Sequence, residues 1–198
     1  MVAKRWFDVI CSLIGLLLLA PILLAIAIII KLDSRGPVLF IQGRVGKNNK
    51  DFHIYKFRTM KLQSESKGLL TLGNHDSRIT KVGYFLRRYK IDEFPQLFNI
   101  LKGDMSFVGP RPELRYYVNF YNEDDFKIFA VRPGITGLAS LKYRNEVELL
   151  KAADDPENFF IKTIIPDKLK YNKEYIKKRN FFFDLKLIFS TIIQVLTK

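Results

Sequence analysis

The stretch VICSLIGLLLLAPILLAIAIII, residues 9–30, decides how this chain is organised. It runs for about 22 residues without a charge, and as a helix it would reach roughly 33 Å, enough to cross a bilayer core. A cleaved signal peptide is excluded, because the apolar run is longer than a signal core and residues 28–31 are no small-residue cleavage site. We therefore expect a membrane segment over residues 1–33, followed by a separate domain over residues 34–198.

Pro21 lies in the middle of this segment, where a proline removes a backbone hydrogen bond and kinks a helix. Basic residues flank it on both sides, with Lys4 and Arg5 before it and Lys31 and Arg35 after it. A simple span would place one basic group outside the cell, against the positive-inside tendency. A helix bent at Pro21 would keep both groups on the cytosolic face. Kinked spanning helices are common, however, so these residues leave both topologies open.

The composition limits the classes of partner and cofactor. A formal net charge of +13 over 198 residues calls for an anionic partner, which is nucleic acid, a phosphorylated small molecule or an anionic lipid surface. The single cysteine, Cys11, excludes a disulfide framework and a cysteine-based zinc site. His53 and His75 do not have metal-ligand spacing, and no phosphate-binding glycine motif is present.

The rest of the chain predicts an α/β fold that is mostly helical with a few short strands. Short apolar runs predict strands at residues 38–41 and 52–55, joined by a hairpin tip at 47–50. Helical spacing predicts the other elements, whereas prolines and glycines exclude regular structure at 109–112 and break the chain at 132–134. The expected helices cover residues 79–89, 92–103 and 116–129, and the tail from residue 167 onward, while 64–76 is expected to be a loop.

Asp92 and Glu93 are adjacent carboxylates at the expected start of a helix, directly after a basic group. Such a start favours phosphate and an ionised carboxylate. An ionised aspartate can attack phosphorus, and a second carboxylate can hold Mg²⁺ against a diphosphate. The same pair is also ordinary first-turn chemistry for any helix, so these two residues alone do not establish a site.

Arg111 stands between Pro110 and Pro112, which stiffen the backbone and present the guanidinium for bidentate contact with a phosphate or a carboxylate. The alternative is a solvated arginine on a surface loop. Alternation places Lys56 and Arg58 on one face of an extended chain. Lys56, Arg58, Arg132 and Arg144 could equally be exposed basic residues.

The order of these motifs resembles the bacterial sugar transferase family, the small monotopic phosphoglycosyl transferases that start the assembly of polyprenol-linked glycans. The resemblance covers nearly the whole chain. It rests on the Pro-broken N-terminal segment and on four motifs: KFRTM at 56–60, IDEFPQLFN at 91–99, KGDMSFVGPRP at 102–112 and RPGITG at 132–137.

The resemblance implies an enzyme that transfers a phosphosugar from a UDP-sugar to undecaprenyl phosphate and releases UMP. Asp92 would attack the β-phosphate and form a covalent intermediate, and Glu93 would be its catalytic partner and a ligand of Mg²⁺. Arg111 matches the arginine of the family's Pro-Arg-Pro loop and Arg87 a phosphate-facing arginine. Lys56, Arg58, Arg132 and Arg144 are then substrate-binding candidates.

The same resemblance implies a location and partners. The N-terminal helix would be re-entrant, in the bacterial inner membrane, with the catalytic domain on the cytosolic face and in contact with phospholipids. Two departures stand out: Ala20 replaces a serine common before the helix-breaking proline, and residues 141–165 differ from the shortest members and could shape the sugar pocket. The largely apolar residues 181–196 predict either an interfacial helix or a buried core helix. A homo-oligomer is compatible with the sequence, which does not decide the oligomeric state.

Three other functions are compatible with parts of the sequence. The net charge and the interleaved lysines and aromatics at residues 171–183 suit a membrane-anchored nucleic-acid-binding protein. The acidic pair and the Pro-Arg-Pro loop have no role there, so we expect no nucleic-acid partner. A silent scaffold is disfavoured by the intact pair, and a hydrolase would pass the phosphosugar to water.

Overall fold

We describe a computed structural model of the chain over residues 2–62, 70 and 76–197. It is mostly helical with a few short strands, as the sequence predicts. The strands are β1 (Leu39–Val45), β2 (Asp51–Phe57), β3 (Ser106–Val108) and β4 (Gly134–Thr136). The helices and helical turns are α1 (Val2–Asp33), η1 (Lys47–Asn49), α2 (Lys81–Arg88), η3 (Ile91–Glu93), α3 (Gln96–Lys102), α4 (Arg115–Val118), η4 (Asp125–Ala130), α5 (Leu138–Lys142), α6 (Glu146–Lys151), α7 (Pro156–Phe159), η5 (Phe160–Ile164), α8 (Ile165–Lys178) and α9 (Phe181–Leu196).

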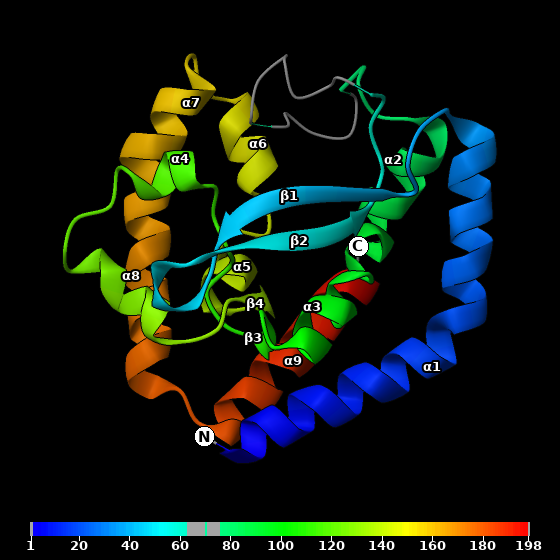
Figure 1. Ribbon diagram of the computed structural model, residues 1–198. Coiled ribbons are helices and arrows are strands. Elements are labelled where there is room, and N and C mark those ends of the chain that lie inside the picture. Colours follow the sequence, from blue (N-terminus) through cyan, green and yellow to red (C-terminus); the bar gives the residue numbers. More distant parts are fainter. Residues whose placement is uncertain (1, 63–69, 71–75, 198) are drawn as a thin grey trace.

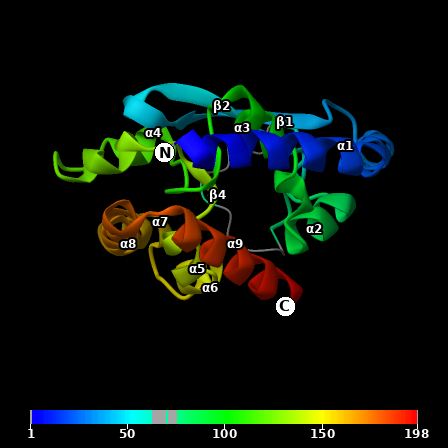
Figure 2. The ribbon, with the colours of Figure 1, turned by 90° about the horizontal axis from the view of Figure 1, so that it is seen from below.

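The elements lie in layers. Helix α1 borders the molecule on two sides, because it bends sharply within its length, and Pro21 is inside it (Figure 1). Seen from below, the β1–β2 hairpin lies on one side and α5, α6, α8 and α9 on the other, with α3 and the first half of α1 nearer the hairpin (Figure 2). A large apolar cluster joins β1, α4, η4, η5 and α8, and another joins α1, β2 and α3.

Helix α1 is long and apolar enough to cross a membrane, and it alone passes that test among the described residues. Most of its large apolar side chains are exposed, for example Leu17 at 68% and Leu32 at 83%. A narrow buried stripe, which includes Asp8 and Ser12, packs on the domain, and Asp8 accepts a hydrogen bond from the backbone N–H of Phe107 (3.2 Å). The helix is thus attached to the domain along one side and leaves its apolar surface uncovered.

The predicted hairpin is present and longer than expected. Strand β1 continues through Gly43 and pairs antiparallel with β2, from Leu39 opposite Phe57 to Val45 opposite Asp51. Asn99 of α3 attaches this helix to β2 by two hydrogen bonds. Its side-chain N–H donates to the carbonyl of His53 (2.7 Å), and its side-chain oxygen accepts from the backbone N–H of Tyr55 (3.0 Å).

The short parallel pair β3–β4 is absent from the sequence-based expectations. Ser106 lies opposite Gly134 and Val108 opposite Thr136. A β-carbon on Gly134 would overlap the backbone nitrogen of Gly109, so only glycine allows this close approach of the two segments. Three-residue strands carry too little periodicity to be recognised from sequence.

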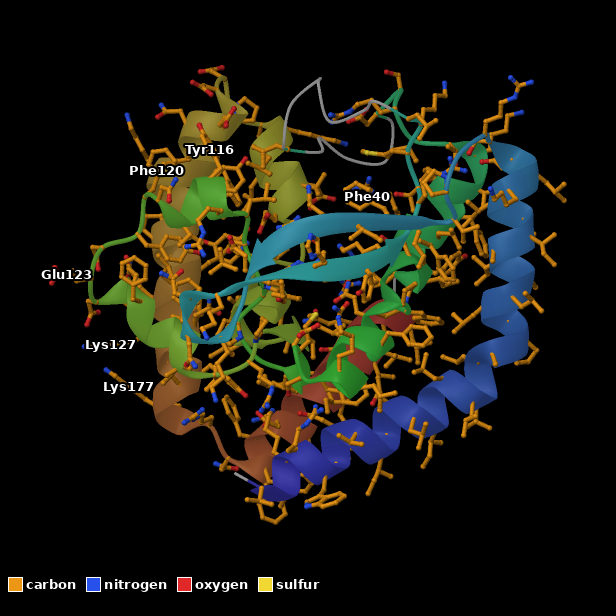
Figure 3. The ribbon with its side chains drawn as sticks, viewed as in Figure 1. Phe40, Tyr116, Phe120, Glu123, Lys127 and Lys177 are labelled. Carbon is orange, nitrogen blue, oxygen red and sulfur yellow. The ribbon has the colours of Figure 1, made fainter. Side chains whose placement is uncertain are left out.

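The helix expected over residues 116–129 is wrong. The chain forms α4, turns, and resumes as η4, because Asn122 and Asp125 take each other's backbone N–H groups (3.0 and 3.1 Å). Such side-chain bonds compete with helical hydrogen bonds. Glu123 and Lys127 lie at the outer margin of this break, with Tyr116 of α4 and Phe120, which follows α4, nearby at the same edge (Figure 3).

The C-terminal tail is helical, as expected, and forms the two helices α8 and α9. Asn180 separates α8 from α9 by capping α9, since its side chain accepts from the N–H of Phe183 (2.9 Å). In α9 the polar face points inward: Asp184 is buried, and Thr191 shares a 2.6 Å hydrogen bond with Thr136. Large apolar side chains face outward instead, namely Phe182, Phe189, Ile192, Ile193 and Leu196.

Candidate active site

Asp92 and Glu93 lie on η3, a single 3-10 turn, and not at the start of an α-helix as the sequence suggested. Because Pro95 has no N–H to offer the carbonyl of Ile91, that carbonyl accepts from the N–H of Phe94 (3.1 Å), which closes a 3-10 turn. Helix α3 begins only at Gln96. Lys90 precedes the turn in the left-handed conformation (φ 59°), which is uncommon for a residue with a side chain.

Both carboxylates are buried, with 9% of Asp92 and 8% of Glu93 exposed. Two cations hold Glu93. Its Oε1 accepts from Lys56 Nζ (3.0 Å) and from Arg111 Nη2, and its Oε2 accepts from Arg111 Nη1 at 3.3 Å. Burial alone would raise the pKa of Glu93, but the charges of Arg111 and Lys56 hold that pKa well below the ordinary glutamate value. Glu93 is therefore ionised.

Asp92 is in the opposite situation. Its Oδ1 is buried and has no hydrogen-bond partner among the described residues. Burial, followed by the neighbouring charge of Glu93, raises the pKa of Asp92, while Lys56, Lys90 and Arg87 act to lower it. A buried carboxylate oxygen without a partner is costly, so its retention indicates a position for a ligand or a reacting atom.

The loop that carries Arg111 is held by its backbone. The N–H of Gly109 donates to Thr136 (2.9 Å), and the N–H of Gly134 donates to the carbonyl of Pro110 (2.9 Å). These bonds extend the β3–β4 pairing into the Pro-Arg-Pro loop and explain why the motifs at 102–112 and 132–137 lie together. The side chain of Arg111 stays 34% exposed, so it can also meet a ligand from outside.

A second group of charged residues, mostly shielded from solvent, contacts the loop through Glu113 and the carbonyl of Pro112. Glu113 accepts from Lys168 of α8 (3.0 Å), and Lys168 also pairs with Glu146 at the start of α6 (3.1 Å). Arg44 of β1 donates to the carbonyl of Pro112 (3.2 Å) and lies 3.8 Å from Glu113. We name Arg44, Glu113, Glu146 and Lys168 the support cluster.

Of the predicted substrate-binding residues, the structure brings Lys56, Arg87 and Arg111 to the carboxylate pair. Lys56 is the second-last residue of β2, and Arg87 is in the last turn of α2. Burial lowers the pKa of Arg87 and the nearby charge of Asp92 opposes that shift, which places Arg87 within electrostatic range of Asp92. These three cations come from separate elements that meet only in the fold.

The structure does not bring Arg58, Arg132 or Arg144 to the pair: within the described residues, none of them contacts Asp92 or Glu93. Arg58 donates to the carbonyls of Ile30 (3.4 Å), Ser34 (2.7 Å) and Arg35, which caps the end of α1. Arg132 donates to Gly103 (2.7 Å) after α3, and Arg144 is exposed. Lys56 and Arg58 therefore do not act on one face, because β2 ends at Phe57 between them. His75 lies outside the described residues.

Sequence reasoning missed the support cluster. Glu113 directly follows the Pro-Arg-Pro motif, and that position was a usable signal. Lys168 and Arg44 offered none, since each is one of 33 basic residues and only its contacts in the fold distinguish it.

A magnesium ion would find few protein ligands here. Within the described residues, no group of three or more His, Cys, Asp or Glu side chains is placed to hold a metal. Mg²⁺ commonly uses one or two carboxylates, with phosphates and waters supplying the rest. Oε2 of Glu93, which accepts a single long hydrogen bond from Arg111 (3.3 Å), fits that habit, so Glu93 fits a metal that arrives with a diphosphate.

Comparison with known proteins agrees with the order of motifs. The family model described as "Bacterial sugar transferase" matches residues 1–198. The UDP-N-acetylgalactosamine-undecaprenyl-phosphate N-acetylgalactosaminephosphotransferase of Aeromonas hydrophila is 42% identical over 98% of this chain and 44% of its own length. The UDP-glucose:undecaprenyl-phosphate glucose-1-phosphate transferase of Escherichia coli (strain K12) is 36% identical over 96% of this chain and 39% of its own length.

This chain thus spans about two fifths of the length of those two relatives. It matches the exopolysaccharide production protein PSS of Rhizobium leguminosarum bv. phaseoli nearly end to end, at 39% identity over 100% of this chain and 97% of that protein. The chain belongs to the bacterial sugar transferase family.

Proposed function

We propose that this protein transfers a phosphosugar from a UDP-sugar to undecaprenyl phosphate, releases UMP and leaves the sugar on a polyprenyl diphosphate. The observation that carries the proposal is the buried Oδ1 of Asp92, which has no hydrogen-bond partner among the described residues and lies near the charges of Lys56 and Arg87. Two relatives named for undecaprenyl-phosphate sugar transfer support the substrate class.

The reaction has two halves. In the first, Oδ1 of Asp92 attacks the β-phosphorus, and the bond from that phosphorus to the bridging oxygen breaks, so UMP leaves with the bridging oxygen and its electron pair. The phosphosugar is then an acyl phosphate on Asp92. In the second, an oxygen of undecaprenyl phosphate attacks the same phosphorus, and the bond to Asp92 breaks, which restores the carboxylate.

The neighbouring cations bind the diphosphate and stabilise charge that develops during attack. Arg111 offers two parallel N–H donors to phosphate oxygens, whereas Lys56 offers a compact charge. Arg87 lies on the Asp92 side of the pair. Mg²⁺, held by Glu93 with the phosphates, would neutralise the diphosphate and favour the departure of UMP. The sugar itself is not identified by these contacts.

The proposed location is the cytosolic face of the bacterial inner membrane. The exposed apolar side of α1, its bend and the basic residues at both of its ends favour a re-entrant helix that begins and ends on that face. The outward apolar side of α9 favours an interfacial helix against phospholipids, because Asp184 and Thr191 are used inside the domain.

The test is UMP release by the purified protein from a panel of UDP-sugars, with Mg²⁺ and undecaprenyl phosphate. Asp92→Asn is the key variant, and Asp124→Asn, an exposed carboxylate outside the site, is its matched control. We expect UMP and lipid-linked sugar from the unchanged protein and from Asp124→Asn only. Without acceptor lipid, the mass of the protein should increase by one phosphosugar.

The outcomes separate the alternatives. UMP release without lipid product would mean that water takes the phosphosugar and the protein is a hydrolase. Full activity in Asp92→Asn would rule out the covalent route. No release with any sugar would leave the relatives' reaction unsupported for this chain.

A further inference from the structure

The free site already contains an anion between its cations, and that anion is Glu93. Arg111 reaches both of its oxygens, and Lys56 lies 3.0 Å from Oε1. Arginine binds a carboxylate and a phosphate in the same forked geometry, so Glu93 occupies the place of a phosphate.

The two carboxylates of the pair therefore differ in their partners. Among the described residues, Glu93 is the carboxylate paired with Lys56 and Arg111, while Oδ1 of Asp92 has no partner. Lys56 and Arg111 are also the cations that the proposed function assigns to the diphosphate. They cannot give the same N–H groups to Glu93 and to the substrate at once.

We propose that Glu93 is an internal stand-in for the substrate diphosphate, which holds Lys56 and Arg111 in place in the free enzyme and releases them when the diphosphate enters. The inference rests on the proposed function, because it takes the diphosphate as the incoming anion. Holding the cations in their binding positions reduces the ordering needed when substrate binds. The exchange is not free, since the charge-assisted bonds to Glu93 must break first.

This exchange predicts that removing the charge of Glu93 strengthens binding while it impairs turnover. In Glu93→Gln the side chain keeps its shape but no longer competes as an anion. Hydrogen bonds to a charged group are stronger than those to a neutral one, so losing this anionic competitor should tighten UDP binding by about tenfold, which is about 1.4 kcal/mol. If Glu93 instead served binding only as a metal ligand, the glutamine variant would not bind UDP more tightly without metal.

The experiment is a titration of UDP by isothermal calorimetry into the full chain in detergent micelles, with EDTA present to remove divalent cations. Asp92→Asn is the matched control, because it removes one negative charge from the adjacent residue without releasing a cation. The second arm repeats Glu93→Gln in an Arg111→Gln background, as a double-mutant cycle. Glu93→Ala serves the same test if the glutamine variant does not fold.

We expect Glu93→Gln to tighten UDP binding by about tenfold and the gain to disappear without Arg111. Simple relief of charge repulsion would give Asp92→Asn an equal gain and would keep the Glu93→Gln gain in the Arg111→Gln background. That pattern, or unchanged or weaker UDP binding by Glu93→Gln, would overturn the exchange. UMP release by the unchanged protein is measured alongside. If the unchanged protein releases UMP but Glu93→Gln does not bind UDP more tightly, the exchange alone is refuted. If the unchanged protein neither binds UDP nor releases UMP, the proposed function is refuted as well.

Discussion

Lys168 offers a direct test of how the Pro-Arg-Pro loop is held. Its side chain is 9% exposed and lies between the carboxylates of Glu113 (3.0 Å) and Glu146 (3.1 Å). Burial acts to lower the pKa of Lys168, but the two glutamates raise it above the ordinary lysine value, so the ammonium is charged. In Lys168→Met the length and apolar stem remain and the charge is lost.

The expected loss of stability in Lys168→Met depends on the contacts that Glu113 and Glu146 retain without the lysine. Removing one partner of a buried ion pair costs about 3–5 kcal/mol, because it leaves an uncompensated charge. Glu113 keeps Arg44 at 3.8 Å, and Glu146, at 26% exposure, regains water. We therefore take about 3 kcal/mol, at the lower end of that range. For a chain of this size, each kcal/mol shifts Tm by about 2–4 °C, so Tm should fall by about 6–12 °C.

The assay is thermal unfolding in detergent, followed by circular dichroism, together with UMP release. Lys170→Met is the matched control, since Lys170 is on the same helix with 75% of its side chain exposed, and we expect a change within about 0.5 kcal/mol. Adding Glu113→Gln to Lys168→Met removes the stranded charge and should recover at least half of the loss. A loss below about 1 kcal/mol in the single variant, or no recovery in the double variant, would refute the reasoning.

Three further predictions concern Asp92, Glu113 and helix α1. Asp92→Asn should abolish UMP release yet raise Tm by about 2–4 °C at neutral pH, because a buried charge without a partner among the described residues is removed. The gain in Tm should vanish in acid, where a carboxyl of raised pKa is protonated in the folded and the unfolded state. A gain in Tm that persists in acid would contradict this explanation. Burial would raise the pKa of Glu113, but Lys168 and Arg44 hold that pKa below the ordinary glutamate value. The ionised Glu113 therefore stabilises the fold above the ordinary glutamate pKa, and this stabilisation is lost as pH falls through the lowered pKa. Glu113→Gln should make the decline of Tm with falling pH less steep, and an equally steep decline would contradict the prediction. Cysteines placed at Val2 or Leu32, in a background without the native cysteine, should both react with a membrane-impermeant thiol reagent from the cytosolic side only; labelling from opposite sides would show a spanning helix instead.

A site residue could be predicted from the sequence only where neighbouring residues in the chain form a recognisable motif. Asp92, Glu93 and Arg111 stand in local patterns of carboxylates and prolines, and the structure pairs Arg111 with Glu93. Arg58 and Arg132 have the same basic character, yet they bind backbone carbonyls at the ends of α1 and α3. A positive charge near a motif does not reveal whether a phosphate or a helix terminus will receive it.

The elements of the fold that the sequence predicted are likewise those written in local patterns. The uncharged run at residues 9–30 and the hairpin at 39–57 are local patterns, and both elements are present. The helix predicted across 116–129 failed because two side chains, on Asn122 and Asp125, outcompete the backbone there. The β3–β4 pair was missed because its close approach depends on Gly109 and Gly134 meeting from distant parts of the chain.

The sequence by itself determined the family, the apolar helix, the acidic pair and the irregular Pro-Arg-Pro loop, since each is written in consecutive residues. Only the tertiary structure decided which cations serve the pair. Lys56, Arg87 and Arg111 come from a strand, a helix and a loop, and their meeting depends on packing between elements that no local pattern records. It also decided that Glu93 is paired with two cations while Oδ1 of Asp92 has no hydrogen-bond partner among the described residues, because burial and charge at a carboxylate depend on every group around it.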